Sequence, residues 1–312
     1  MSKNLRVFAV ATTLAVLSGP LLWAADDGSP APATTSQAAG KPSDTSETQE
    51  ITVTANRIEL EKKVSKFVYQ IATLQNGEGM ARWHIPVCPI VAGVLQQEGD
   101  FTVRRIFEIA RTAGVPVAAE PCRPNLLVFV TPDAKQFFSG MSTHTRLLTF
   151  SGAHPSVIDE FIRTPRPVRV WYKTAMLTPD GKPLVETDRI EDDSQQFGGA
   201  PIIAPATAYA RISAIWGMSR VLVVVDQARL QGVSVGQFAD YVALAGLAQI
   251  KMGAHLGDAP TILKLFDDTP QAGPAGMSEW DRAFLKSLYA TESTSKGQRS
   301  QIAHTIVREM AH

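Results

Sequence analysis

The stretch NLLVFVT (125–131) decides the fold of this chain. Leu126 to Val130 form an unbroken apolar run, which is typical of a strand buried on both faces of a sheet. An amphipathic helix is predicted just before it, over 101–113, where apolar residues recur at helical spacing until Gly114 and Pro116 end the pattern. Helix, turn and strand together predict a compact α/β unit.

Two further elements are predicted upstream of this unit. Apolar residues recur at helical spacing over 64–74, which predicts a helix. The four residues Ile51, Thr52, Val53 and Thr54 alternate apolar and polar side chains, which predicts a short strand. The N-terminal α/β unit is therefore expected to span 50–150.

The second half, 151–312, is predicted to be α+β and mostly helical. A strand is expected at 168–176, and the segments 209–216 and 220–226 flank Gly217-Met218 as the two arms of a β-hairpin would. Strands precede helices in this half, so the chain as a whole is predicted to be α+β, with a small sheet in its second half. The helices are expected at 234–251, 260–266, 278–290 and 296–310.

Residues 1–24 have the order of a Sec-type signal peptide, with two basic residues followed by an apolar run and then small residues. The apolar run extends from Val7 to Trp23, and cleavage is expected at Ala24 or Ala25. The run is shorter than the ~20 apolar residues that a membrane-spanning helix needs. We expect a periplasmic or secreted protein with no stable membrane insertion after cleavage.

Residues 25–49 are predicted to form a disordered linker, because they are rich in Ser, Thr, Ala and Pro and hold no large apolar side chain. Removal of 1–24 takes away Lys3 and Arg6 and leaves 28 basic against 30 acidic residues. This balance argues against nonspecific binding to nucleic acid, which requires a strong basic excess.

Cys88 and Cys122 are the only cysteines of the chain. Two cysteines in an exported chain most simply pair with each other. A redox-active pair is the alternative, but such pairs are usually spaced as CxxC. We therefore predict a structural disulfide, whose ring of ~35 residues would restrict the unfolded chain by about 3–4 kcal/mol.

A search for zinc-peptidase and nucleotide-binding motifs identifies none. The sequence contains no HExxH and no GxxxxGK[ST]. The helix expected at 234–251 carries one acidic residue, Asp240. We favour a hydrogen-bonded carboxylate in the core at this position over a catalytic acid. His255 and Asp258 form an HxxD pair in a glycine-rich turn. We assign no catalytic residue, metal ligand or cofactor, although a pair of distant carboxylates as in glycosidases stays open.

An acidic loop is expected between 179 and 205. It carries several carboxylates, but the spacing of an EF-hand calcium loop is missing. A solvated loop is therefore favoured over a calcium site.

Three N-terminal segments carry a family resemblance: ARWHIPVCPIVAGV (81–94), FTVRRIFEIARTAGVPV (101–117) and PCRPNLLVFVT (121–131). They resemble an uncharacterised family of secreted proteins from alphaproteobacteria and related Gram-negative bacteria. In that family two cysteines also head these segments, which implies the pairing of Cys88 with Cys122.

Three C-terminal segments, FADYVALAGLAQI (238–250), APTILKLFDD (259–268) and GMSEWDRAFLKSLY (276–289), are more loosely similar to secreted domains of zincin-like topology. In those domains a helix carries the active-site His and Glu, whereas this chain has an alanine-rich apolar run. The resemblance therefore implies a degenerate zincin-like frame. We expect a non-catalytic envelope protein that acts as a binding or scaffold module for an unknown envelope partner. The alternative is a metal-dependent peptidase or hydrolase with unusual ligands such as His255, Asp258 and Asp240.

The segment EITVTANR (50–57) is similar to the TonB box of outer-membrane transporters. In those proteins an extended segment adds a strand to the periplasmic protein TonB. Ile51, Thr52, Val53 and Thr54 would be the pairing residues here. A strand paired inside the domain is the alternative, and it is the one we favour.

Overall fold

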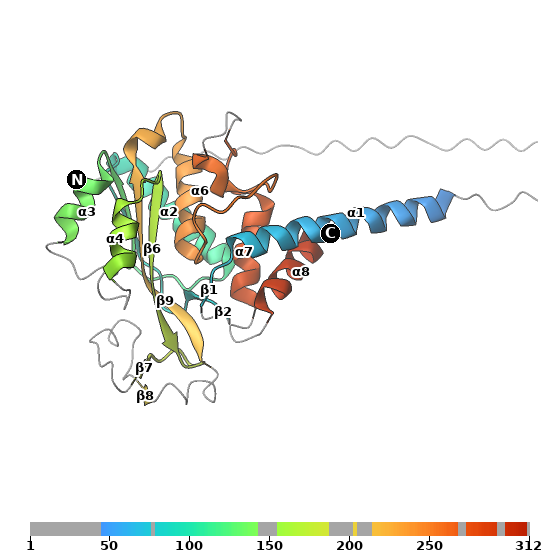
Figure 1. Ribbon diagram of the computed structural model, residues 1–312, viewed down its shortest axis with the longest axis horizontal. Coiled ribbons are helices and arrows are strands. Elements are labelled where there is room, and N and C mark those ends of the chain that lie inside the picture. Colours follow the sequence, from blue (N-terminus) through green and yellow to red (C-terminus); the bar gives the residue numbers. More distant parts are fainter. Residues whose placement is uncertain are drawn as a thin grey trace, which may run out of the picture. The chain divides into compact units, whose positions relative to one another are not determined.

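The computed structural model describes residues 45–75, 79–142, 155–186, 202–204, 214–267, 273–291 and 297–310 (Figure 1). The predicted signal peptide, most of the predicted linker and the acidic residues between 188 and 193 lie outside these ranges. Within the described residues, no helix has the length and apolar character needed to cross a membrane. Apart from the first residues of α1, the described chain belongs to one unit that runs from Glu47 to His312, and the fold below is that of this unit.

A five-stranded sheet lies at the centre of the described part of the chain. Its strands follow the order β3-β9-β5-β4, and β6 pairs with the other edge of β9. β3 and β5 run parallel to β9, β4 runs parallel to β5, and β6 is antiparallel to β9. The bounds are β3 (Arg82–Trp83), β4 (Pro89–Ala92), β5 (Leu126–Thr131), β6 (Val168–Leu177) and β9 (Ile215–Asp226).

Strand β9 is paired along both of its edges. On one edge β5 pairs with its second half and β3 pairs with Gly217 and Met218. On the other edge β6 follows it from Val225 to Ile215, with a register shift that leaves Ser219 as an extra residue. The hairpin predicted around Gly217-Met218 is therefore wrong, because both residues lie inside one continuous strand that has paired neighbours on either side.

The sheet is covered on both faces, as the apolar run of β5 predicts. Leu126, Val128 and Val130 belong to the core shared with α2 and α6, whereas Leu127 and Phe129 pack with α3 and α4. The same division separates the two sets of helices in Figure 1. The bounds are α2 (Gln96–Ala113), α3 (Ala134–Ser142), α4 (Pro155–Arg163) and α6 (Val235–Leu247).

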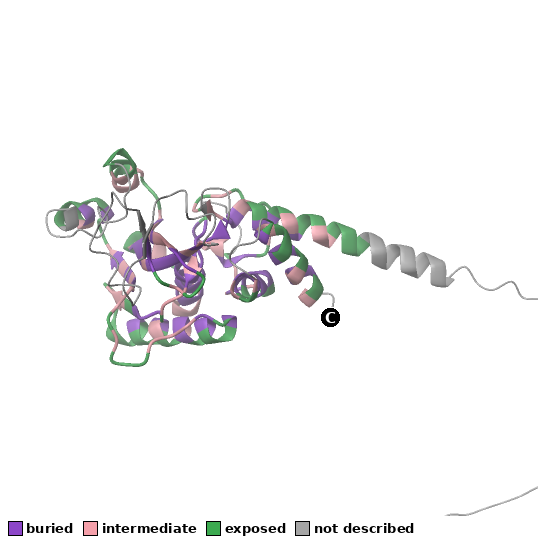
Figure 2. Cartoon of the chain, turned by 90° about the horizontal axis from the view of Figure 1, so that it is seen from below, coloured by how far each residue is buried: buried purple, intermediate pink, exposed green. Residues whose placement is uncertain are grey.

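Helix α6 packs closely on the sheet because of a glycine. A Cβ atom at Gly246 would lie 2.7 Å from Cδ1 of Leu126, so only glycine permits this approach without a shift of Leu126. From Phe238 to Leu247 every residue of α6 is buried. Burial is concentrated around the sheet and its neighbouring helices, while exposed residues lie on the outer helix faces (Figure 2).

The C-terminal helices agree with the sequence pattern. Ser278 caps α7 with its hydroxyl, which accepts a hydrogen bond from the Asp281 N–H. Trp280, Phe284 and Leu288 form the buried stripe of that helix. The segment expected at 260–266 is a short 3₁₀ helix. The bounds are η4 (Gln227–Leu230), η5 (Ile262–Phe266), α7 (Glu279–Ala290) and α8 (Gln298–Met310).

Helix α1 (Thr45–Ile71) contains Ile51, Thr52, Val53 and Thr54, so the strand predicted for these residues is wrong. An alternation over four residues is too short to distinguish the two periods, and the helical spacing of 64–71 continues toward the N-terminus. The disordered linker predicted over 25–49 is wrong for residues 45–49, because the helix begins at Thr45, and the rest of that prediction lies outside the described residues. Binding to TonB stays a prediction, and it would require α1 to unwind at these residues.

Two small strand pairs complete the described residues. β1 (Leu74–Gln75) is antiparallel to β2 (Gly79–Met80), and β7 (Leu184–Glu186) is parallel to β8 (Ile202–Ala204). The second pair lies in the segment expected to be an irregular loop.

The predicted disulfide between Cys88 and Cys122 is confirmed, with the two Cα atoms 6.1 Å apart. It joins the residue before β4 to the segment before β5. The chain is thus α+β with a disulfide in its N-terminal half, as the sequence indicates.

Candidate functional site

The chain segments that leave β5 and β9 diverge to opposite faces of the sheet. β5 is followed by α3, which packs on one face with Leu222 and Val224. β9 is followed by η4 and α6, and α6 belongs to the core on the other face. In open sheets with parallel strands, ligands bind outside the carboxyl ends of the strands at such a divergence. β6 begins at the same edge because it is antiparallel to β9.

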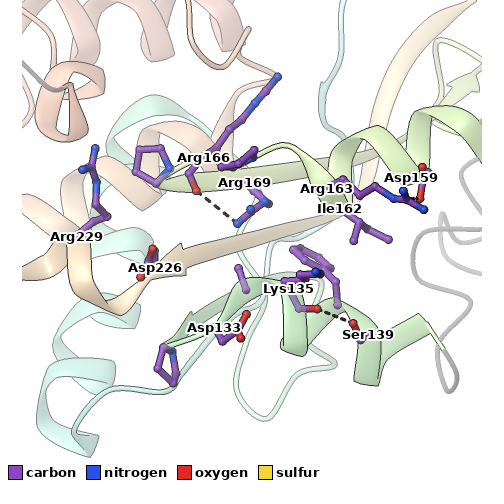
Figure 3. A pocket seen from close by; sticks show the side chains of 15 residues that line it. Asp133, Lys135, Ser139, Asp159, Ile162, Arg163, Arg166, Arg169, Asp226 and Arg229 are labelled. Carbon is purple, nitrogen blue, oxygen red and sulfur yellow. Dashed lines mark hydrogen bonds and ion pairs between the residues drawn. The ribbon is translucent and has the colours of Figure 1, made fainter.

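A cavity of about 1100 Å³ lies at this edge (Figure 3). Its wall comes from the start of α3, the end of α4, the α4–β6 connection and the end of β9. We call it the cationic cavity, because basic side chains outnumber acidic ones on its wall. The basic residues are Lys135, Arg163, Arg166, Arg169 and Arg229, and the acidic residues are Asp133, Asp159 and Asp226.

The three acidic residues of the wall each have a structural partner. Oδ1 of Asp133 accepts a hydrogen bond from the Gln136 N–H at 2.9 Å, at the start of α3. Oδ1 of Asp226 accepts one from the Ala228 N–H at 3.0 Å, where it caps η4. Asp159 pairs with Arg163 one turn further along α4, at 2.7 Å. Each of these carboxylates therefore stabilises the helix at which it lies.

Arg169 is a cation of this wall that is almost fully buried, with 8% of its surface exposed. Its Nε donates to the Thr164 carbonyl at 3.3 Å and its Nη1 to the Arg166 carbonyl at 3.4 Å. Its guanidinium carbon lies 5.9 Å from the centre of the Phe138 ring. No ion pair joins Arg169 to a carboxylate within the described ranges.

Burial lowers the pKa of Arg169, Asp226 raises it, and Arg166 lowers it further. The direction shows that burial and a like charge outweigh the one nearby carboxylate. Buried charges in proteins are normally paired with an opposite charge. A bound anion would supply that missing charge.

The alternation of β6 explains why Arg169 faces this cavity. Val168 and Val170 belong to the core shared with α2 and α6, so the residues between and after them face the other side. Trp171 accordingly packs on that other face with Phe138. Proline residues at 165 and 167 flank Arg166 and restrict the backbone before the strand.

The described residues that line the cavity include no His and no Cys. Its serine, Ser139, donates its hydroxyl hydrogen bond to the Lys135 carbonyl at 2.8 Å. A nucleophile beside a general base is therefore not formed by these residues. Guanidinium and ammonium groups on an edge of this kind are suited to hold phosphate or carboxylate groups.

Asp240 is the hydrogen-bonded core carboxylate that the sequence favoured. Its Oδ1 accepts from Nε of Arg105 at 2.7 Å and its Oδ2 from the Met277 N–H at 2.7 Å. His255 and Asp258 are exposed and line a different cavity, whose wall does not include Asp240. In the part of the chain that the structure describes, no three His, Cys, Asp or Glu residues are grouped to hold a metal ion.

No pattern in the sequence indicates the cationic cavity. Its basic residues extend from Lys135 to Arg229, and no local spacing relates them. The nearest signal is the run Thr164–Arg169 (TPRPVR), where two prolines alternate with basic residues before a strand. Comparisons of the chain with protein-family models, with curated proteins and with solved structures find no match.

Proposed function

We propose that this protein is a non-catalytic binding module of the cell envelope, and that its cationic cavity holds an anionic organic molecule. The disulfide between Cys88 and Cys122 supports a location in an oxidising compartment. The periplasm or the exterior of the cell, as the N-terminal sequence indicates, would provide it.

The observation that carries the proposal is the burial of Arg169 without a carboxylate partner in the described residues. A guanidinium that is held by two carbonyls and an aromatic ring keeps a fixed position. A fixed guanidinium recognises the planar or tetrahedral oxygens of carboxylate and phosphate better than a mobile one. Arg169 is thus suited to bind one anionic group.

The size and the other walls of the cavity indicate a ligand with a carbon body. The volume of about 1100 Å³ is slightly above the range of roughly 300–1,000 Å³ for small-molecule pockets, and it is much larger than a single inorganic ion requires. Phe138, Ile162 and three prolines add apolar surface to the wall.

Calorimetric titration with glycerol phosphate and with citrate tests the proposal. We expect at least one of these probes to bind, with an affinity that falls as salt is added because salt screens exposed charges. Arg169→Gln should weaken that binding about 10-fold or more, since a charge-assisted hydrogen bond contributes roughly 1.5–3 kcal/mol. The control Arg111→Gln removes an exposed arginine of α2 and should leave it unchanged. Absence of binding to both probes, or equal binding by the Arg169 variant, would contradict the proposal.

The peptidase alternative is tested separately. Asp240 is already held by Arg105 and Met277, so it would have to leave both partners to bind a metal ion. Elemental analysis of protein purified without chelator measures metal content directly. Stoichiometric zinc would overturn the non-catalytic assignment.

A further inference from the structure

A second cavity adjoins the cationic cavity. It has a volume of about 810 Å³, and its wall comes from the start of β6, the turn after α6 and η5. Arg166 and Pro167 line both cavities. Arg229, on the wall of the cationic cavity, donates a hydrogen bond at 3.3 Å to the carbonyl of Phe266, on the wall of the second. The two cavities therefore share a boundary.

Arg166 lies on this boundary, and its backbone carbonyl and its side chain have different roles. Its carbonyl accepts a hydrogen bond from Arg169, which holds that guanidinium in the cationic cavity. Its own side chain is exposed and extends away from that of Arg169 (Figure 3). The Arg166 guanidinium forms no hydrogen bond or ion pair with any residue that the structure describes. It is free to contact an anion beside the boundary.

Two lysines accompany Arg166 on the wall of the adjoining cavity. Lys264 donates from Nζ to the Gly257 carbonyl at 2.9 Å and to the Ala259 carbonyl at 3.5 Å, which leaves one N–H donor of its ammonium group. Lys251 is exposed, and its backbone N–H is held by the Ile71 carbonyl at 2.8 Å. Asp258 and Asp267 are the carboxylates of this wall, so the three cations exceed the acidic residues by one.

Apolar side chains form the remaining surface between these charges. Val168, Tyr241, Ile250 and Phe266 all line the adjoining cavity and are themselves nearly buried. Apolar surface of this kind binds a hydrocarbon chain more favourably than a series of charged groups.

We propose that one ligand occupies both cavities and carries two anionic groups joined by a carbon spacer. Arg169, with Lys135 and Arg229, holds the first phosphate or carboxylate group. Arg166, with Lys251 and Lys264, holds the second, and the spacer crosses the boundary at Pro167. The inference rests on the proposed anion-binding function of the cationic cavity, and it adds that the ligand is an elongated molecule with two charged ends.

The test compares alkyl phosphates by calorimetric titration into the full-length protein. The probes are butyl phosphate, with one anionic group, and a series of straight-chain alkanes with a phosphate at each end. We expect the two-ended probes to bind at least about 10-fold tighter than butyl phosphate once the spacer is long enough to reach both cavities. A shorter two-ended probe should show no such gain.

Substitutions then locate the second group. Lys251→Gln should remove most of the gain of the long two-ended probe while leaving the affinity for butyl phosphate within about 2-fold. Arg166→Gln should also remove most of that gain, and because Arg166 lines both cavities its effect is read from the ratio of the two affinities. Lys251 is the sharper test, because its exposed side chain holds no structural partner in the described residues. Lys62→Gln, which removes an exposed charge from α1, is the matched control and should leave the gain intact.

The outcomes separate this inference from the proposed function. If neither the phosphate probes nor citrate bind, the proposed function fails. If citrate alone binds, the function stands and the inference of a ligand with two phosphate ends fails. If one-ended and two-ended probes bind equally and both depend on Arg169, the function stands and the two-cavity inference fails. If the long probe binds tighter but Lys251→Gln and Arg166→Gln leave that gain unchanged, the second group lies elsewhere and the inference fails as well.

Discussion

Asp240 is the acidic residue of helix α6, and both of its oxygens are engaged. We expect Asp240→Ala to lower the free energy of unfolding by about 3 kcal/mol, because it breaks a nearly buried ion pair and leaves the Met277 N–H without an acceptor. Glu108→Gln breaks the exposed ion pair of the same Arg105 and should cost less than about 1 kcal/mol. Urea unfolding of the two variants measures both values. Equal costs would show that Asp240 is not a structural carboxylate.

His84 gives the protein a specific dependence on pH. Burial, together with the smaller effect of the nearby Arg82, lowers the pKa of His84 to about 4. Nε2 of His84 is buried without a hydrogen-bond partner in the described residues. Between pH ~6.5 and ~4 the unfolded chain binds a proton that the folded chain does not, so the free energy of unfolding falls as the pH is lowered, by about 2–3 kcal/mol over that window.

His84→Gln should therefore flatten the pH profile of stability in this window. His304→Gln, at an exposed position of α8, serves as the control. Chemical unfolding at a series of pH values measures the slope for each variant. A slope unaltered by His84→Gln would assign the pH dependence to other groups.

At the residue scale, local features could be predicted from the sequence and long-range ones could not. Ser278 caps α7 through a residue three positions later, so its role is visible in the sequence itself. The residues around Arg169 come from α3, the α4–β6 connection and β9, and these elements meet only in the folded chain. The candidate site therefore cannot be predicted from local patterns in the sequence.

At the scale of single elements, the turn between β4 and α2 depends on Gly93. This residue has φ +86°, and a Cβ atom there would lie 1.9 Å from the Val130 carbonyl oxygen. We expect Gly93→Ala to lower the free energy of unfolding by at least about 3 kcal/mol, because backbone strain and a backbone clash add together. Gly181→Ala has a similar φ of +82° with open space around it, and it should cost only about 1–2 kcal/mol. Thermal or urea unfolding compares the two, and similar losses would show that the close approach to Val130 is unimportant.

The elements that the sequence predicted correctly have long or strongly patterned signals. The strand at β5 and the helices α6 and α7 fall within a few residues of their expected positions. Gly217-Met218 was interpreted as a turn because glycine is common in turns, but in the sheet it lies where β9 pairs with β3 and β6. Whether these two residues form a turn or a strand depends on pairing with strands that are distant in sequence. A local sequence pattern carries no information on that pairing.

At the scale of the whole molecule, the disulfide links segments that hydrogen bonds already join. The Cys88 N–H donates to Oδ1 of Asn125 at 2.7 Å, and the Cys88 carbonyl accepts from the Asn125 N–H at 3.0 Å. We therefore expect the double variant Cys88→Ala, Cys122→Ala to keep the native fold. Its free energy of unfolding should be lower by about 3–4 kcal/mol, because the unfolded chain regains the freedom of the closed loop. Circular dichroism checks the fold and urea unfolding the stability; a loss under about 1 kcal/mol would contradict the loop-entropy explanation.

The position of β9 has a consequence for the order in which the molecule can assemble during synthesis. β3, β4 and β5 precede β9 in the chain and emerge before it during synthesis or export, yet β3 and β5 have β9 as their common neighbour. Until residue 226 has emerged, the nascent chain exposes unpaired strand edges and apolar side chains, which favour aggregation or capture by chaperones. A fragment that ends at residue 214 should bind a hydrophobic dye strongly and unfold without a cooperative transition, whereas the full chain should do neither. Cooperative unfolding of that fragment would show that the N-terminal strands can close a sheet before β9 arrives.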